Sequence, residues 1–420
     1  MENINLAHEI EERLPARALT IIEKAGRLAH ARGERLYLVG GAVRDLLLDK
    51  PVLDIDLVLE GDAVALADEL SQSENVKITL HKPFLTANLQ YPDLSLDLTT
   101  ARKESYARSG ALPAVQPGTL KDDLFRRDFR INAMAVSLNQ EDYGRLIDCH
   151  GGLDDLHNKL VRVLHEKSFI DDATRLWRAV RYEQRLDFDI EQGTQALLRC
   201  DLPMLKTISG DRIWYELECV FGEELPEKVL VRAAELGVLP YLHPQLSIGG
   251  RLAARFDEAR RISLPQKPST TLYMALLTFN LDAEAIERLI DYLKLDKMMS
   301  RTLRESQKIK ALHEELSEEP LQPSAIYLHL HGYSEETLKT NLIACEPAGV
   351  RRNIQLYLDE LRYVKTSLNG DDLIALGIKE GPSIKLLLGL LLDARLDGEV
   401  ASREDEERLV KELFIRRNAI

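Results

Sequence analysis

Apolar and polar residues alternate in two different ways along the chain, and the change between them separates two parts. Up to about residue 155, short apolar runs of period two predict strands, with helices among them. The strands are predicted at 36–39, 54–59, 77–80, 86–90, 94–98 and 133–138, and helices over most of 1–33, over 42–48 and over 63–71. Beyond that point, helical spacing continues between prolines to the end of the chain. The pattern predicts an α/β head followed by an all-helical remainder.

A glycine-rich turn follows the first of these strands. Residues 38–45 read Leu-Val-Gly-Gly-Ala-Val-Arg-Asp. Gly40 and Gly41 let the backbone come close to a triphosphate, and the helix after them begins with free N–H groups that favour anions. Arg44 lies in the first turn of that helix, where its guanidinium can pair with a phosphate. The turn therefore predicts a triphosphate site.

Two carboxylates follow in the next predicted strand, at Asp54 and Asp56. Alternate residues of a strand face the same side, so these two project together while Ile55 and Leu57 point into the core. Mg²⁺ is usually held by one or two carboxylates together with substrate phosphates. The pair therefore predicts a magnesium site. Asp97, in a later strand, is either a third carboxylate near the metal or an ordinary edge-strand residue.

Further motifs follow in the same order as in one known family. They are RRDFRINAMA at 126–135, DCHGGLDDL at 148–156, FIDDATRLWRAVRYEQRLDF at 169–188 and SGDRIWYE at 209–216. Together with GGAVRD and its DxD, they resemble the class II tRNA nucleotidyltransferase and bacterial poly(A) polymerase family. Three positions depart from the usual pattern: Arg130 replaces a threonine, and Asp171 and Asp211 replace glutamates.

The resemblance implies an architecture and a set of domain boundaries. It implies a polymerase-β-like nucleotidyltransferase head of α/β class, followed by an all-α neck, body and tail. The catalytic head would cover residues 1–154, the neck, which binds the nucleotide base and RNA, residues 155–222, and the tRNA-binding body and tail residues 223–420.

A helix predicted over 171–185 would supply the second half of the site. Asp172, Arg175, Arg178 and Arg181 recur at spacing three, which places neighbours on one side of a helix. A carboxylate beside a guanidinium can present both acceptor and donor edges to a base. The resemblance implies that Asp172 and Arg175 read the Watson–Crick edge of the incoming CTP or ATP, and that Arg178 and Arg181 hold the triphosphate or brace the pocket.

The RRD segment and the stretch before it complete the expected site. By resemblance, Arg127 contacts the nucleotide, while Asp128 and Asn132 position the sugar or hold the head together. The polar stretch between residues 100 and 122 contains two prolines and two glycines and is predicted to form a long mobile loop. In the family, the corresponding loop is associated with addition of the terminal A.

Composition restricts the setting of this chemistry. Four cysteines form no CxxC pair, the first residues do not resemble a signal peptide, and no apolar run is long enough for a bilayer. These features predict a soluble cytoplasmic protein without a membrane segment, and no partner protein is implied. The net charge of −14 is unusual for an RNA-binding protein, but arginines cluster locally, which predicts a basic face on an acidic body.

The combined interpretation is a tRNA nucleotidyltransferase. It would add CCA to the tRNA 3′ end from CTP and ATP without a nucleic-acid template, by two-metal nucleotidyl transfer that uses Mg²⁺ and releases pyrophosphate. An enzyme that only adds A to CC-ended tRNA shares every motif and stays open as an alternative. An inactive RNA-binding scaffold is the alternative of another class, and the paired carboxylates Asp54 and Asp56 argue against it.

Overall fold

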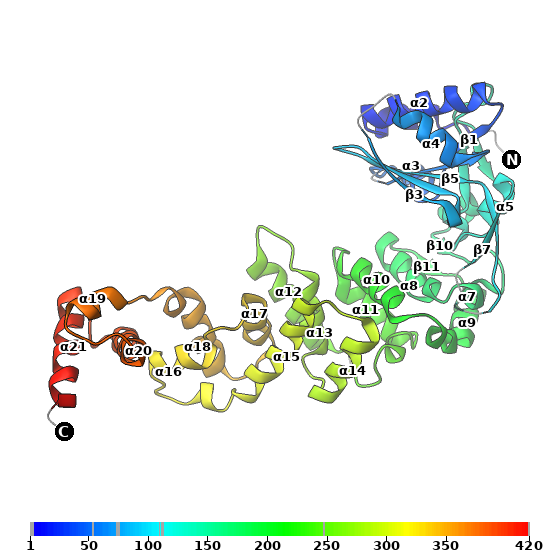
Figure 1. Cartoon of the computed structure of the whole chain (residues 1–420). Helices are drawn as coiled ribbons and strands as arrows, with labels where there is room; N and C mark the ends of the chain where they lie inside the picture. The colour runs from blue at the N-terminus through cyan, green and yellow to red at the C-terminus, as the bar shows by residue number, and fades with distance from the viewer. Residues whose placement is uncertain are drawn as a thin grey trace. The chain divides into compact units, whose positions relative to one another are not determined.

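The structure is a computed structural model that describes residues 4–52, 54–72, 76–108, 110, 113–246 and 248–418. The chain forms two compact units, residues 1–242 and residues 243–420, which are coloured in chain order in Figure 1. The first unit contains a mixed β-sheet and helices, and the second is helical. The predicted fold class, an α/β head followed by a mostly helical region, is confirmed.

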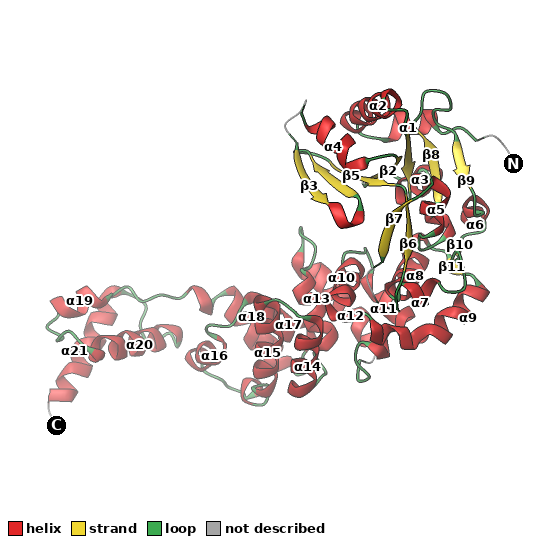
Figure 2. Cartoon of the chain, turned by 45° about the vertical axis from the view of Figure 1, so that its right-hand side comes forward, coloured by secondary structure: helices red, strands yellow, loops and turns green. Residues whose placement is uncertain are grey.

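A seven-stranded sheet forms the centre of the head, in the order β3-β4-β5-β2-β1-β8-β9 (Figure 2, yellow). The pair β2 and β5 is parallel, and the other neighbouring strands are antiparallel. The strands are β1 (Arg35–Val39), β2 (Ile55–Glu60), β3 (Lys77–His81), β4 (Thr86–Gln90), β5 (Ser95–Thr100), β8 (Met134–Ser137) and β9 (Leu146–Asp148). The strand predicted at 86–90 is confirmed to the residue, whereas β9 was not predicted.

Helices cover one face of this sheet, and Figure 1 shows α2 and α4 on the same side. Leu38 of β1 and Ile55 and Leu57 of β2 point into the core beneath them, as the alternation predicted. Tyr37 and Val58 point to the other face. The helices of this part are α1 (Ala7–Arg13), α2 (Ala16–Ala31), α3 (Gly41–Leu47), α4 (Ala63–Ser71) and α5 (Leu120–Phe125).

The stretch between residues 100 and 122 contains regular structure, so the prediction of a long mobile loop was wrong for most of it. Strands β6 (Arg102–Ser105) and β7 (Ala114–Pro117) pair as an antiparallel hairpin that leads into α5. Residues 109, 111 and 112 lie outside the described residues. Each strand has four residues, and neither RKES nor AVQP shows an apolar alternation, so the sequence pattern did not reveal them.

The helical part of the first unit differs from the prediction at two places. Strands β10 (Leu160–Val161) and β11 (Asp189–Ile190) form a short parallel pair, so this region is not purely helical. The single helix predicted over 171–185 is wrong, because α7 ends before Asp172, whose backbone is extended. The helices here are α6 (Gly152–His157), α7 (Ser168–Asp171), α8 (Thr174–Leu186), α9 (Gln192–Asp201), α10 (Gly210–Phe221) and α11 (Pro226–Glu235).

The second unit is helical, and two apolar clusters among its described residues pack helices α15 to α21. One cluster packs α15 to α18 through residues such as Ile309, Leu342 and Ile354, and the other packs α19 to α21 through Leu391 and Val410. The helices are α12 (Gly250–Ser263), α13 (Thr270–Thr278), α14 (Ala283–Leu293), α15 (Lys297–Ala311), α16 (Pro323–Leu330), α17 (Glu335–Ala344), α18 (Ala348–Asp359), α19 (Gly370–Ala375), α20 (Pro382–Leu396) and α21 (Arg403–Asn418). Among the described helices, none combines the length and apolar composition that crossing a bilayer requires.

Candidate active site

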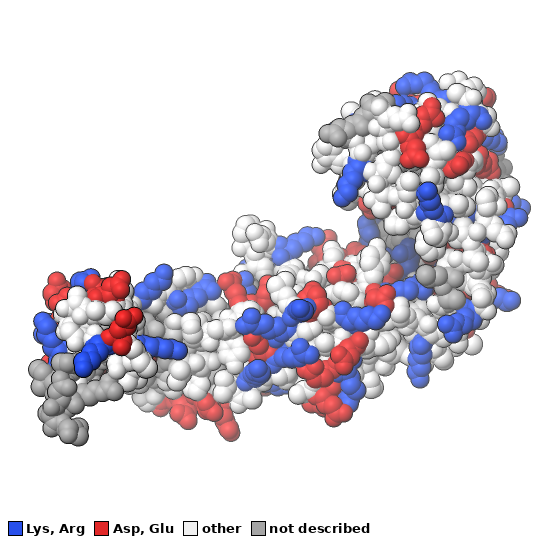
Figure 3. Space-filling view, in the orientation of Figure 1, with Lys and Arg blue, Asp and Glu red and all other residues white. Residues whose placement is uncertain are grey.

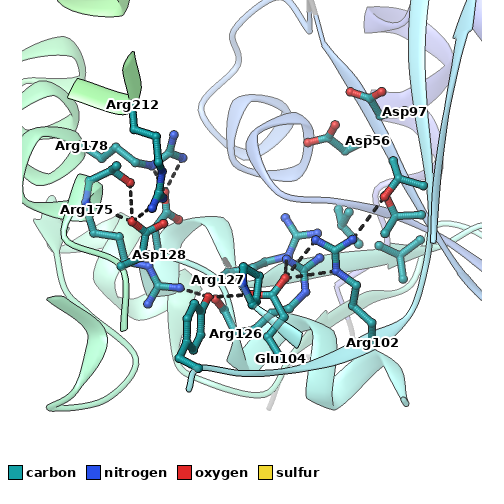
Figure 4. A pocket seen from close by; sticks show the side chains of 18 of the residues that line it. Asp56, Asp97, Arg102, Glu104, Arg126, Arg127, Asp128, Arg175, Arg178 and Arg212 are labelled. Carbon is teal, nitrogen blue, oxygen red and sulfur yellow. Dashed lines mark hydrogen bonds and ion pairs between the residues drawn. The ribbon is translucent and has the colours of Figure 1, made fainter. Parts of the chain in front are cut away.

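Two carboxylates lie side by side on the sheet face opposite α2 and α4. Asp56 of β2 and Asp97 of β5 are paired in register across the parallel strands, while their neighbours Leu57 and Leu96 point into the core on the other side. Both carboxylates line a cavity of about 500 Å³ (Figure 4). Asp97 Oδ1 accepts a hydrogen bond from Asn88 Nδ2 at 2.8 Å. The placement of Asp97 beside Asp56 supports the interpretation as a third carboxylate of the site.

The electrostatic environment of Asp56 favours a bound cation. Burial raises the pKa of Asp56, the charges of Asp97 and Asp54 raise it further, and Arg127 acts in the opposite direction. Asp54 is exposed immediately before β2, and with Asp56 it lines a second cavity of about 200 Å³. A divalent cation relieves such repulsion, and the oxygen ligands fit a hard ion.

The carboxylates therefore suit a metal that is shared with a substrate. Within the part of the chain that the structure describes, no group of three or more His, Cys, Asp or Glu side chains is arranged to hold a metal by itself. This agrees with the usual Mg²⁺ arrangement, in which one or two carboxylates act together with substrate phosphates.

The glycine turn gives the smaller cavity its shape. Gly40 has φ +72°, and a Cβ there would lie 2.7 Å from Arg127 Nη1 and 3.4 Å from Asp56 Oδ2. Position 40 therefore requires glycine for two reasons, the backbone conformation and the guanidinium packed against it. Gly41 begins α3 and also lines this cavity.

Arg44 lies in the wall of the smaller cavity. It is buried, and Nε and Nη2 donate to the two carboxylate oxygens of Asp45 at 2.9 and 3.0 Å. Its Nη1 donates to Asn132 Oδ1 at 2.7 Å. Arg44 thus lines the smaller cavity, but it lies in the last turn of the short helix α3 and not in the first turn as predicted, and two neighbours hold its guanidinium.

The RRD segment joins the head to α8. Asp128 is buried and accepts two hydrogen bonds from Arg178, at 2.9 and 2.6 Å, and one from Asn132 Nδ2 at 3.0 Å. Burial alone would raise the pKa of Asp128, but these partners hold it at about 2. Arg127 Nη2 donates to the buried carboxylate of Asp123 at 3.1 Å. The RRD segment thus takes part in two groups of ionised side chains, one around Asp128 and one around Asp123.

Arg175 lies across the larger cavity from Asp56 and Asp97 (Figure 4), and Asp172 lines the same cavity. Asp172 Oδ1 accepts hydrogen bonds from the hydroxyl of Thr174 at 2.8 Å and from Arg212 Nη2 at 2.8 Å. The bond to Thr174 competes with helix continuation and accounts for the break at this point.

The arginines of α8 have different environments. Arg175 is buried and donates to Ser168 Oγ at 2.7 Å and to the carbonyl of Arg126 at 2.6 Å. Arg178 lines both cavities. Arg181 is not among the lining residues of these two cavities and pairs with Glu223 at 3.2 Å. Three of the four positions spaced by three therefore meet at the larger cavity.

Sequence reasoning missed the charged residues of the hairpin. Glu104 Oε1 accepts hydrogen bonds from Arg102 Nη2 at 2.9 Å and from Arg126 Nη1 at 3.2 Å, and all three residues line the larger cavity. No motif marks Arg102 or Glu104. Arg212 lies within SGDRIWYE, but its partner Asp172 is 40 positions away, so spacing did not reveal the pair.

The predicted basic face is partly neutralised. In α15, Arg301 pairs with Glu305 and Arg304 pairs with Glu287, each at 2.6 Å. On the face drawn in Figure 3, Lys and Arg side chains are interspersed with Asp and Glu side chains. A basic residue in the sequence therefore does not by itself supply free positive charge.

Comparison with known proteins agrees with this geometry. A family model described as the poly A polymerase head domain matches residues 36–162, and a second, described as a probable RNA and SrmB-binding site of polymerase A, matches residues 187–248. This part of the chain is a nucleotidyltransferase head domain, as shown by its mixed sheet, its paired carboxylates and its match to the head-domain model.

Individual relatives and a solved structure extend the match over nearly the whole chain. The A-adding tRNA nucleotidyltransferase of Geobacter sulfurreducens is 35% identical over 97% of this chain and 48% of its own length. That of Halalkalibacterium halodurans is 33% identical over 94% of this chain and 92% of its own. The Thermotoga maritima CCA-adding enzyme in complex with tRNA is 31% identical, with a TM-score of 0.79, and 99% of this chain and 100% of that chain are covered.

The chain belongs to the tRNA nucleotidyltransferase and poly(A) polymerase family. It spans about half the length of the Geobacter relative. The family typically uses a divalent metal ion.

Proposed function

We propose that this protein is a tRNA nucleotidyltransferase that builds the CCA end of tRNA from CTP and ATP without a nucleic-acid template. The observation that carries the proposal is the larger cavity, which Asp56 and Asp97 of the sheet line together with Asp172 and Arg175. One pair has the charge for a metal and a triphosphate, and the other has the acceptor and donor groups for a base.

Asp54 and Asp56 would hold Mg²⁺, with Asp97 beside them. The metal would supply charge neutralisation on the α-phosphate and a lower pKa for the attacking hydroxyl of the RNA. Gly40 and Gly41 leave room for the triphosphate, because neither carries a side chain at the cavity wall.

The arginines and the buried acid supply binding and orientation. Arg44, Arg127 and Arg178 would attract the triphosphate from three sides of the smaller cavity. Asp128 and Asn132 would keep Arg178 and Arg44 in place through the hydrogen bonds described above. Arg181, paired with Glu223, would brace α8.

Base selection would fall to Asp172 and Arg175. Their acceptor and donor groups are held at fixed positions by Thr174, Arg212 and Ser168. Groups that the protein holds in place can select the base without a nucleic-acid template, because they supply the complementary hydrogen-bonding edge.

The proposal extends to the parts of the chain. Residues 1–154 would catalyse, residues 155–222 would bind the nucleotide base and the RNA end, and residues 223–420 would bind the body of the tRNA by shape and phosphate contacts. A cytoplasmic location belongs to the same proposal, because tRNA, CTP and ATP would be its substrates.

Addition of only the terminal A is the second candidate function. It is favoured by the names of two relatives, which are A-adding enzymes at 35% and 33% identity. CCA addition is favoured by the likeness to the Thermotoga maritima structure over both full lengths.

One experiment separates these candidates. Three tRNA transcripts, ending at the discriminator base, after the first C and after the second C, are supplied with Mg²⁺ and labelled CTP or ATP separately. Incorporation of CTP into the first two and of ATP into the third supports CCA addition, whereas incorporation of ATP into the third alone selects A addition. No incorporation with any transcript would favour the inactive scaffold. Asp54→Ala with Asp56→Ala should abolish incorporation, and retained incorporation would contradict the metal assignment.

A further inference from the structure

Tyr182, on α8, lies where three motifs of the site meet. Its ring centroid is 5.2 Å from the guanidinium carbon of Arg44, 5.5 Å from that of Arg178 and 5.1 Å from that of Arg181. The side chain is 8% exposed, and its residue lines the smaller cavity together with Asp54 and Asp56. Tyr182 therefore contacts cations from both α3 and α8 at the proposed triphosphate site.

The ring of Tyr182 completes a closed series of side-chain contacts. Arg44 donates to Asn132, Asn132 donates to Asp128, and Asp128 accepts from Arg178. Arg178 Nη2 also donates to the hydroxyl of Tyr182 at 3.3 Å. The ring of Tyr182 in turn contacts the guanidinium of Arg44. Without the ring, Arg44 would lose its direct contact with α8.

Phe129 fixes the ring itself. It is fully buried next to Asp128 in the chain, and its ring meets that of Tyr182 edge to face, with centroids 5.8 Å apart and an interplanar angle of 79°. The RRD segment thus holds α8 through the Asp128–Arg178 ion pair and through this aromatic contact.

An aromatic ring has one property that a further carboxylate would lack. The face of the ring attracts guanidinium groups through its quadrupole and carries no net charge. Asp45 and Asp128 already neutralise part of the charge on Arg44 and Arg178. A third acid would repel a triphosphate, whereas a ring can position the arginines and leave their positive charge available.

We propose that Tyr182 is a positioning residue that orients Arg44 and Arg178 toward the triphosphate of either nucleotide. The inference rests on the proposed function, because it assigns a role within that site. The proposed role of Tyr182 concerns the triphosphate and not the base, because Asp172 and Arg175 are not among the partners of the ring.

The test compares variants of position 182 with a control on the same helix. Tyr182→Leu removes the ring, Tyr182→Phe keeps it, and Leu186→Ala removes a buried apolar side chain one turn away. Each variant is measured for KM with CTP and with ATP in the transcript assay. Inorganic tripolyphosphate, which has no base, serves as a competitive inhibitor.

Tyr182→Leu should raise both KM values and the inhibition constant of tripolyphosphate by the same factor, about tenfold. The relative use of CTP and ATP should not change. Tyr182→Phe should bring all three constants back to within about twofold of wild type. Leu186→Ala should lower the Tm and leave the inhibition constant of tripolyphosphate unchanged.

A further variant keeps the shape of the ring and serves as the test if Tyr182→Leu does not fold. Pentafluorophenylalanine at position 182 reverses the ring quadrupole at nearly constant volume, so it should raise the inhibition constant relative to Tyr182→Phe. An unchanged inhibition constant in this variant, or a fall in kcat alone, would overturn the proposal. If the wild type incorporates no nucleotide, the proposed function fails, and direct calorimetric binding of tripolyphosphate still tests the role of the ring.

Discussion

At the residue scale, Asp56 is the position where burial and neighbouring acids together disfavour an ionised carboxylate. The structure buries it and places Asp97 and Asp54 near it. Only Arg127 offsets part of this effect among the causes that shift its pKa. A group in such an environment is destabilising in the ionised form and gains most from a bound cation.

Replacement of this acid should therefore stabilise the metal-free protein. Because the pKa of Asp56 is raised in the folded state, its ionised form reduces stability above the folded pKa, and the reduction disappears below the ordinary pKa of aspartate. Asp56→Asn should increase the free energy of unfolding near pH 7 by on the order of 1 kcal/mol. The gain should vanish as the pH falls through the raised pKa, and urea titrations without metal at pH 7 and pH 4 measure it. A loss of stability at pH 7 would contradict this account.

Gly40 allows a second prediction with a matched control. Gly40→Ala combines a positive φ with a Cβ 2.7 Å from Arg127 Nη1, whereas Gly33 has nearly the same φ, +71°, with nothing within 4 Å. Gly33→Ala should lose about 1 kcal/mol of stability from backbone strain. Gly40→Ala should lose more, about 2 kcal/mol, because its ψ of −135° lies in a region that glycine alone adopts readily. Only Gly40→Ala should also raise KM for ATP and CTP, because it displaces Arg127. Equal kinetics for the two variants would show that the close approach has no role.

At the element scale, the hairpin β6–β7 is attached to the head by charge rather than by apolar packing. Arg102 donates to Thr86 Oγ1 at 3.2 Å and shares the carboxylate of Glu104 with Arg126. Burial and the neighbouring charge of Arg126 lower the pKa of Arg102. The carboxylate of Glu104 is therefore what allows two partly buried guanidinium groups to lie together.

Loss of that charge should be costly. Glu104→Gln should reduce the free energy of unfolding by about 3 kcal/mol, because it leaves Arg102 without a carboxylate partner and Arg126 with Asp123 alone. Glu287→Gln, which breaks the exposed pair with Arg304, should cost less than about 1 kcal/mol. Denaturant unfolding of the two variants measures the difference. Equal losses would indicate that the hairpin does not depend on this network.

The elements also differ in how far the sequence predicted them. The strands β2 and β4 and the helix α4 carry strong apolar periodicity, and their predicted bounds agree to within one or two residues. The break at Asp172 was missed because a polar side chain, bonded to Thr174, ended the helix where periodicity continued. The hairpin was missed because each strand has only four residues and neither RKES nor AVQP alternates apolar with polar positions.

At the scale of the whole molecule, the chain divides into two compact units, and the residues of the candidate site all lie in the first unit. A chain that ends at Leu242 should therefore bind ATP with the dissociation constant of the full chain. If residues 223–420 bind the tRNA body as proposed, this shorter chain should bind tRNA at least about tenfold more weakly, a loss of about 1.4 kcal/mol. Calorimetry with ATP and fluorescence anisotropy with labelled tRNA check the two statements. Undiminished tRNA affinity would place the RNA contacts in the first unit.

The sequence by itself determined the chemistry of this protein. The order of adjacent residues was enough to predict the glycine turn, the DxD and the RRD segment, because a turn, a strand and a helix start each depend on a few neighbouring residues. Tertiary structure decided which of these side chains remain available. It paired Asp97 with Asp56, gave Asp172 the partner Arg212, and placed Tyr182 among three arginines. The contacts of Asp97 with Asp56, of Arg212 with Asp172 and of Arg44 with Tyr182 join residues 40 or more positions apart, and only the folded chain brings these residues together.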